Sequence, residues 1–319
     1  MKKPLVILAG PTAVGKTKAS IGLAKAIGGE IISADSMQVY RYMDIGSAKI
    51  SPQEMQGVPH YLVDVLDPRD EFHVVRFQQM AKQAMEEIYS HGNIPILVGG
   101  TGFYIQSVLY DIDFAADGED SAYRKELEQL AQANGAEYLH QKLKEVDFEY
   151  AAQVHANNVK KVIRALEFYH QTGKKLSAHN IEQRSKESGY NFAYFVLNDR
   201  RAHLYQRIDL RVEQMLKDGL VEEVTRLKGM GYTRDMVSMQ GLGYKEMLDY
   251  LDGRISLEEA VEIIKRDTRH FAKRQITWFK REKDVCWIDK SQLDNREDLV
   301  LETMLSVLRE RRIFPCTPQ

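Results

Sequence analysis

A glycine-rich stretch near the N-terminus is the first segment that could bind a ligand. Residues 10–17 read GPTAVGKT and fit the pattern G-x-x-x-x-G-K-[ST] at every position. In this pattern, backbone N–H groups and the start of a helix surround a phosphate, the lysine reaches the outer phosphates, and the threonine hydroxyl can bind Mg²⁺. We therefore predict a phosphate-binding loop with Thr17 as a metal ligand. Its residues are Gly10, Pro11, Thr12, Ala13, Val14, Gly15, Lys16 and Thr17.

A carboxylate follows the second apolar run of the chain. The sequence SADSMQ (33–38) overlaps the end of EIISA (30–34), a run typical of a buried strand. Ligands of open α/β sheets bind at the carboxyl ends of the strands, so Asp35 is expected beside the phosphate loop. There it could ligate Mg²⁺ or act as a base. A solvated Asp that caps the next element is the alternative.

The apolar run IPILV (94–98) is followed by residues that are unusual for an ATP-hydrolysing protein. In such proteins the corresponding strand usually ends in Asp, whose carboxylate orients Mg²⁺. Here Gly99, Gly100 and Thr101 follow instead, which argues against ordinary ATP chemistry. The same three residues could also form a tight turn in which Thr101 caps a helix.

The elements that must position these residues are typical of an α/β protein. Short apolar runs alternate with helical patterns, as expected for strands of a parallel sheet that is covered on both faces. We predict a P-loop NTPase-like parallel sheet flanked by helices. The expected strands are 5–9, 30–34, 60–65, 94–98, 192–198 and 285–289, and the expected helices are 15–27, 74–89, 200–229, 243–252, 256–282 and 295–311.

Residues 113–192 differ from the rest of the chain because they contain helical patterns and no strand candidate. We predict an all-helical insertion domain over 113–192. The α/β core, with the C-terminal helices, would then comprise residues 1–112 and 193–319.

The composition restricts the cellular setting. The chain has 319 residues, 44% of them hydrophobic and 28% charged, and no apolar run approaches the about 20 residues that span a bilayer. Two cysteines, Cys286 and Cys316, are too few for a disulfide framework, which favours a reducing compartment. We therefore expect a cytoplasmic protein without a membrane segment.

Positive charge is concentrated near the C-terminus, although the net charge is −2. Eight Lys and Arg residues lie between 265 and 283, against Asp267 and Glu282. Such a helix could bind an anionic partner such as RNA, but charge runs on helices are often only solvated faces.

Seven motifs occur along the chain between residues 10 and 282. In order they are GPTAVGKT, SADSMQVYRYMDIGSAK, LVGGTGFY, VIRALE, LYQRIDLRVEQML, MQGLGYKE and AKRQITWFKRE. Together they resemble the bacterial tRNA dimethylallyltransferases, or tRNA isopentenyltransferases, of the IPP transferase family. The resemblance implies transfer of a dimethylallyl group from dimethylallyl diphosphate to N6 of adenosine 37, in tRNAs that read codons beginning with U. The phosphate loop would then hold a diphosphate leaving group and Mg²⁺, and no phosphoryl group would be transferred.

The resemblance also implies roles for individual residues. Asp35 would be the general base, and Lys16, Thr101 and Arg211 would contact the diphosphate or the reacting adenosine; an exposed helix arginine is the alternative for Arg211. Lysine 161 stands where the family has Arg, so a phosphate contact is kept while a base contact is in doubt. The residues expected to contact the tRNA anticodon stem-loop are Asp35, Ser36, Met37, Gln38, Thr101, Arg124, Lys160, Lys161, Arg164, Gln240, Lys273, Arg274 and Gln275. A monomer is expected.

Three other functions stay open at this point. A small-molecule kinase would explain the phosphate loop, but neither the Gly-Gly-Thr turn nor the helical insert. An adenylate dimethylallyltransferase would use similar chemistry on free AMP or ATP, without need of the insert or the basic helix. An RNA-binding protein could sense a nucleotide with its loop and catalyse nothing.

Overall fold

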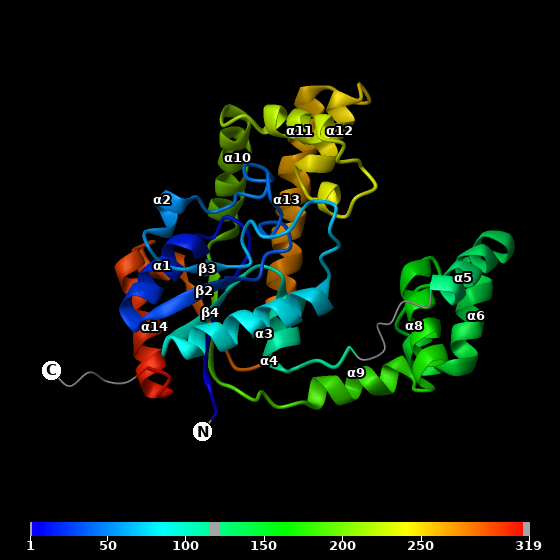
Figure 1. The fold of residues 1–319 in the computed structure, drawn as a ribbon, viewed down its shortest axis with the longest axis horizontal. Coiled ribbons are helices and arrows are strands. Elements are labelled where there is room, and N and C mark those ends of the chain that lie inside the picture. Colours follow the sequence, from blue (N-terminus) through cyan, green and yellow to red (C-terminus); the bar gives the residue numbers. More distant parts are fainter. Residues whose placement is uncertain (1, 115–120, 315–319) are drawn as a thin grey trace. The chain divides into compact units, whose positions relative to one another are not determined.

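The computed structural model describes residues 2–114 and 121–314 (Figure 1). The chain divides into two compact units, one made of Met1–Leu109 with Gly189–Gln319 and the other of Tyr110–Ser188. The second unit therefore starts and ends a few residues before the insert expected at 113–192. The first unit's α4 (Gly102–Leu109) ends directly before the second unit starts, and β5 (Asn191–Asn198) already pairs with the sheet from Asn191.

The first unit contains a six-stranded sheet in which all neighbouring strands are parallel. Its strand order is β3-β2-β4-β1-β5-β6. The α/β class expected from the sequence is confirmed, since the inner strands are buried along almost their whole length. The other strands are β1 (Pro4–Ala9), β2 (Gly29–Ser33), β3 (His60–Tyr61), β4 (Ile94–Gly99) and β6 (Val285–Asp289).

Helices cover the sheet on both faces. On one face, α1 (Lys16–Ile27) and α14 (Glu297–Glu310) pack together over a core that includes Val6 and Leu8 of β1. The helices α3 (Val74–Ser90) and α4 (Gly102–Leu109) pack on each other and on β4. The alternate side chains of β1 therefore point into two separate layers of helices, which fixes the position of the loop that follows this strand.

Four further helices stand above the carboxyl ends of the strands (Figure 1). They are α10 (Arg201–Lys217), α11 (Leu220–Gly229), α12 (Tyr244–Leu251) and α13 (Leu257–Phe279). The single helix expected over 200–229 is wrong, because Gly219 has a φ of 99° and separates α10 from α11. The remaining elements of this unit are α2 (Pro52–Met55) and the 3₁₀ turns η1 (Ser238–Gln240) and η2 (Lys290–Leu293).

The strand expected at 60–65 is much shorter than its apolar pattern suggests. Only His60 and Tyr61 pair with β2, and the backbone then turns, with φ close to 60° at Leu62 and Asp64. The rest of HYLVDV is a loop whose backbone binds the segment after β2, through Asp64 N to Gln38 O and Val65 N to Val39 O. The apolar pattern of this segment therefore reflects the packing of a loop and not a long strand.

The second unit has a core of its own. Its described elements are helical: α5 (Ser121–Asn134), α6 (Ala136–Val146), α7 (Phe148–Ala151), α8 (Val159–Thr172) and α9 (Leu176–Ser185). Leu139 and Leu143 of α6 pack with Val162 and Leu166 of α8. In each helix the two residues are four positions apart and so lie on the same face. No helix in the described parts of the chain is both long and apolar enough to cross a membrane.

Candidate active site

The phosphate-binding pattern lies where β1 passes into α1. Its loop leaves the sheet after Ala9, and Lys16 is the first residue of the helix. The Lys16 Nζ donates hydrogen bonds to the carbonyls of Gly10 (3.0 Å) and Pro11 (2.8 Å), so the ammonium lies over the mouth of the loop. Burial lowers the pKa of Lys16 to about 8, the charge of Asp35 raises it, and that of Arg211 lowers it further. Lysine 16 is thus close to both other charges.

Asp35 follows β2 and projects from the same edge of the sheet. Its Oδ1 accepts hydrogen bonds from the backbone N–H groups of Met37 (2.8 Å) and Gln38 (3.3 Å), which fixes the carboxylate in a turn. Across residues 2–114 and 121–314, no hydrogen bond to its Oδ2 is found. One oxygen therefore holds the carboxylate in place while the other can accept a proton from outside.

A third loop, Gly99 to Thr101, lies beside Asp35. The Thr101 backbone N–H donates to the carbonyl of Ala34 (3.4 Å), the residue before Asp35. A Cβ at position 99 would lie 2.3 Å from the Ala34 carbonyl oxygen, so only glycine allows this approach. Thr101 also accepts the first helical hydrogen bonds of α4 through its carbonyl, from Tyr104 and Ile105. The segment therefore forms a turn at the start of a helix and also lies beside Asp35.

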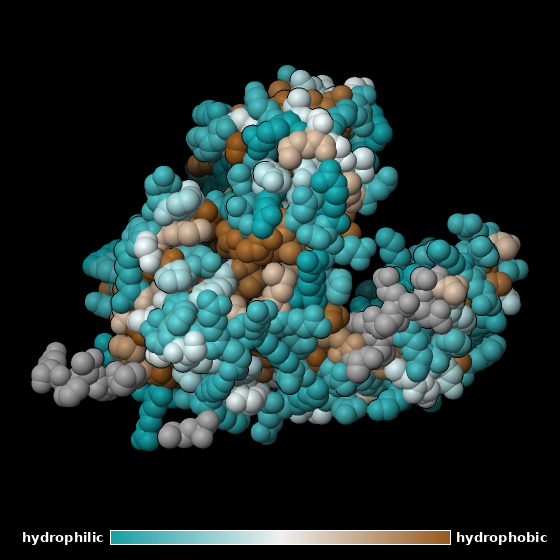
Figure 2. All heavy atoms as spheres, in the orientation of Figure 1, coloured by the Kyte–Doolittle hydropathy of each residue, from teal (hydrophilic) through white to brown (hydrophobic). Residues whose placement is uncertain are grey.

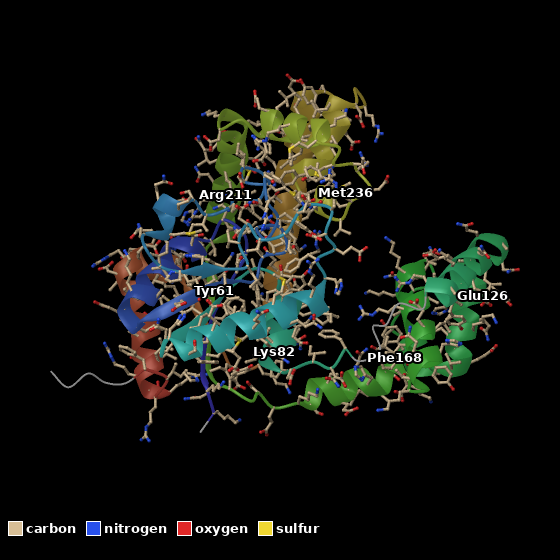
Figure 3. The ribbon with its side chains drawn as sticks, viewed as in Figure 1. Tyr61, Lys82, Glu126, Phe168, Arg211 and Met236 are labelled. Atoms are coloured by element: carbon tan, nitrogen blue, oxygen red, sulfur yellow. The ribbon has the colours of Figure 1, made fainter. Side chains whose placement is uncertain are left out.

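Arg211 lies on α10 (Figure 3). Part of the residue is exposed to solvent, but its guanidinium lies close enough to Lys16 and Asp35 to interact with their charges. The pKa of Arg211 is lowered, first because its guanidinium loses water and second because Arg207 carries the same charge nearby. The charge of Asp35 raises this pKa in part. The structure therefore brings Lys16, Asp35 and Arg211 together, from three separate segments of the chain.

Gln275 of α13, an expected tRNA contact, makes its hydrogen bonds inside the protein. Its side chain is 6% exposed, and both ends of its amide bind the protein. The Oε1 accepts from Thr12 N (2.9 Å) in the phosphate loop, and the Nε2 donates to the Gly100 carbonyl (3.0 Å). Gln275 therefore connects two loops of the site, and its expected tRNA contact stays a prediction.

Lys290, which the sequence analysis did not single out, supports the phosphate loop from behind. The side chain is 1% exposed, and its Nζ contacts the Val14 carbonyl (3.4 Å) and pairs with Glu297 (2.6 Å). A buried lysine requires such a partner. In the sequence, only its position directly after the apolar strand β6 indicates that Lys290 lies near the sheet.

The basic run on α13 separates into paired and exposed charges. Lys265 pairs with Glu213, Arg266 with Asp267, and Arg269 with Asp209. Lys273 and Arg274 are exposed, as is Arg266, and Arg274 lies over the ring of Phe271. Gln240, in η1, is exposed as well, and Met37 packs against Gly241.

In the second unit, the expected tRNA contacts have two kinds of surroundings. Arg124 of α5 makes a two-pronged ion pair with the buried Glu167 of α8, with hydrogen bonds of 2.7 to 3.1 Å, which ties two helices together. Lys160, Lys161 and Arg164 are exposed on the first turns of α8. Positive side chains at a helix N-terminus add to its partial positive charge, an arrangement suited to an anion.

A magnesium ion fits the donors of the phosphate loop. In the described residues there is no group of three or more His, Cys, Asp or Glu that could form a metal cage. Mg²⁺ in phosphate sites needs only one or two protein ligands, because substrate phosphates and water supply the others. The Thr17 hydroxyl, exposed in the first turn of α1, is a ligand of this kind.

The family of the chain follows from a sequence comparison. A family model described as "IPP transferase" matches residues 38–282. The chain belongs to the IPP transferase family. The expected resemblance is thereby confirmed, and with it the prediction that the chain is a prenyl-transferring enzyme.

Individual relatives of this IPP transferase family member cover almost the whole chain. A tRNA dimethylallyltransferase of Lachnoclostridium phytofermentans is 61% identical over 98% of this chain and 99% of its own. The crystal structure of a tRNA isopentenylpyrophosphate transferase from Bacillus halodurans is 44% identical, with a TM-score of 0.73 and 98% of both chains covered. A eukaryotic dimethylallyltransferase, solved in crystallographic snapshots of its action on tRNA, is 29% identical, with a TM-score of 0.84 over 99% of this chain and 81% of its own.

Proposed function

We propose that this enzyme transfers the dimethylallyl group from dimethylallyl diphosphate to N6 of adenosine 37 in tRNAs that read codons beginning with U. The observation that carries the proposal is the convergence of Lys16, Asp35 and Arg211 at one edge of the sheet, with the Asp35 Oδ2 open. A phosphate loop, a base and a second cation are the groups that a prenyl transfer to an amine needs.

The chemistry divides between these groups. The N6 amine of adenine is a weak nucleophile because its lone pair is delocalised into the ring. As its nitrogen bonds to C1 of the dimethylallyl group, Asp35 takes the N6 proton and the bond between C1 and the diphosphate oxygen breaks. Lys16, Arg211 and the loop N–H groups stabilise the charge that develops on the diphosphate, with Thr101 close to the reacting atoms. Mg²⁺, held through Thr17, would supply further charge neutralisation.

An apolar surface for the hydrocarbon group is available on the same unit. Figure 2 shows hydrophobic side chains gathered on its visible face, between α3 and the helices α11 and α12. A five-carbon group transferred from water to such a surface gains about 0.8 kcal/mol per buried CH₂. A prenyl group in contact with this face would be favoured over a purely polar substrate, such as that of a small-molecule kinase.

The contacts proposed for the tRNA are the exposed ones. Lys273 and Arg274 on the first unit, and Lys160, Lys161 and Arg164 on the second, supply positive charge for backbone phosphates. Ser36, Met37 and Gln38 follow β2, and Gln240 ends η1; we propose that a flipped adenosine passes these residues to reach Asp35. We propose that the enzyme acts as a monomer in the cytoplasm.

The function is tested by incubating the protein with Mg²⁺, radiolabelled dimethylallyl diphosphate and either unmodified tRNA or AMP. We expect label in tRNA only, lost when adenosine 37 is replaced by guanosine. Label in AMP alone would instead show an adenylate dimethylallyltransferase. Label in neither acceptor would disprove prenyl transfer to both, and an ATP-hydrolysis assay then examines the kinase alternative.

Removing the exposed charges of α13 is expected to weaken tRNA binding. The double variant Lys273→Ala and Arg274→Ala should raise the KM for tRNA and reduce the slope of log KM against log salt by about 2, because each lost phosphate contact releases about one counterion less. The control is Lys25→Ala, an exposed lysine at the other end of α1 from the phosphate loop. An unchanged salt slope in the double variant would remove both residues from the interface.

Gln275→Met is expected to impair diphosphate binding and to leave tRNA binding unchanged. The variant keeps the shape of the side chain but leaves Thr12 N–H and the Gly100 carbonyl without partners, at about 1–3 kcal/mol each. Calorimetry with inorganic pyrophosphate and thermal unfolding would both show a loss. Arg274→Ala is the matched control, since it should change only the KM for tRNA. If Gln275→Met changed tRNA binding alone, Gln275 would be a tRNA contact and not a support of the phosphate loop.

A further inference from the structure

Glu223 of α11 is a buried carboxylate outside the group formed by Lys16, Asp35 and Arg211. It is 2% exposed and accepts four hydrogen bonds. Three come from consecutive backbone N–H groups, those of Asp44 (2.9 Å), Ile45 (2.8 Å) and Gly46 (3.1 Å). The fourth comes from the hydroxyl of Tyr244 (2.9 Å). Successive N–H groups that converge on one carboxylate form a strong anion-binding turn, so the segment 44–46 is fastened to α11.

The same turn is packed against the start of α12. A Cβ at Gly46 would lie 2.6 Å from the Tyr244 ring, so the backbone touches the aromatic ring directly. A second contact lies closer to Asp35, where the Met37 side chain would meet a Cβ at Gly241 at 2.5 Å. The segment that follows β2 is therefore held at two places by the helices above the sheet.

A continuous set of hydrogen bonds connects this turn with Asp35. The Ala48 N–H donates to the Ile45 carbonyl (3.0 Å), and the Ala48 carbonyl accepts from the Gln38 side-chain amide (3.1 Å). Gln38 in turn donates its backbone N–H to Asp35 Oδ1. Displacement of the turn at 44–46 would thus pull on Gln38, one of the two residues that fix the carboxylate.

We propose that Glu223 is a positioning residue of the prenyl-transfer reaction, which holds the 36–48 segment so that the free oxygen of Asp35 faces the substrate amine. This inference rests on the proposed function. Tyr244 assists Glu223 through its hydroxyl and through its ring against Gly46. Neither residue touches substrate; both act through the turn, Ala48 and Gln38.

A carboxylate is required at this position for a chemical reason. Glutamine has the same shape but only one accepting oxygen, and its NH₂ would face backbone N–H groups that need an acceptor. Glu223→Gln should therefore free at least one N–H of the turn, and the 36–48 segment should loosen without a change of side-chain volume. The adjacent Glu222 is exposed, so Glu222→Gln is a control with the same substitution on the same helix.

The test compares the full-length protein with these variants in two measurements. The first is hydrogen exchange of residues 36–49, which should become faster in Glu223→Gln and stay unchanged in Glu222→Gln. The second is kcat for tRNA prenylation per active site, with the active sites counted by pyrophosphate binding. We expect kcat to fall about tenfold to a hundredfold in Glu223→Gln, since a catalytic group misplaced by about 1 Å can cost about a hundredfold. The affinity for pyrophosphate should be unchanged, because the phosphate loop is held by other residues.

The outcomes separate positioning from general destabilisation. A residue needed only for stability would lower the number of active sites and leave kcat per site and the exchange of folded 36–49 as they are, which would overturn the proposal. If Glu223→Gln does not fold, Tyr244→Phe removes one of the four hydrogen bonds and should show a smaller loss of kcat in the same direction. If the unsubstituted protein does not prenylate tRNA, the proposed function fails, while exchange still decides whether Glu223 holds the turn.

Discussion

Asp35→Asn is expected to lower kcat for tRNA prenylation by about 10²–10⁴-fold, the usual contribution of a general base. The amide oxygen can still accept from Met37 N and Gln38 N, so the turn that holds the side chain is kept. What is lost is the oxygen that takes the N6 proton, because the amide nitrogen in its place is not basic. Affinity for tRNA and for pyrophosphate should therefore stay nearly unchanged.

Single-turnover kinetics with preformed complex would measure this loss without interference from binding or product release. The matched control is Asp44→Asn, a carboxylate on the same segment that pairs with Lys49. It should lower kcat far less, because its carboxylate takes no part in the proton transfer. Full turnover in Asp35→Asn would show that another group accepts the proton and that Asp35 only shapes its loop.

Lys16→Met is the second substitution with a large expected effect. The side chain keeps much of its length but loses the charge that stabilises the departing diphosphate. Removal of one such group from a preorganised site typically costs about 10²–10³ in rate. We expect a loss of this size in kcat, together with weaker binding of dimethylallyl diphosphate, in the prenylation assay.

The lowered pKa of Lys16 gives this prediction a pH dependence. Below its pKa of about 8 the Lys16 ammonium is charged, and above it the amine is neutral and attracts diphosphate less. The value of kcat/KM for dimethylallyl diphosphate reports the free enzyme, so it should fall as the pH rises through about 8. In Lys16→Met this fall should be absent, while any titration of the substrate itself remains in both proteins. A fall of equal size in the variant would assign the titration to another group.

The positions of the three loops of the site follow from the sequence, because each comes directly after an apolar run. The residues of the phosphate loop are consecutive, so their pattern alone specifies the turn and the helix that follows. Asp35 and Thr101 each follow a buried strand, and parallel strands present their carboxyl ends at a common edge. The parallel sheet and the helical second unit were likewise predictable from local patterns. The chain direction and the periodicity of apolar residues determine them.

Contacts between distant segments were not predictable in this way. A glutamine in a basic helix is typical of a surface, yet Gln275 binds Thr12 across 263 residues of sequence. Arg124, expected at RNA, pairs with Glu167 of another helix, and its tRNA contact stays a prediction. For Glu223 a signal existed, since it shares a helical face with Leu220, Val224 and Leu227, where a carboxylate must be buried with partners.

The sequence by itself therefore determined the family, the fold class and the segments that carry the phosphate loop, the base and the third loop. Only the tertiary structure decided which polar side chains hold those segments together. The physical reason is that the partners of Gln275 and Glu223 are mostly backbone N–H and C=O groups, which every residue except proline has in the same form. A side chain that binds such groups leaves no complementary residue type in the sequence, so its partners appear only when the chain is folded.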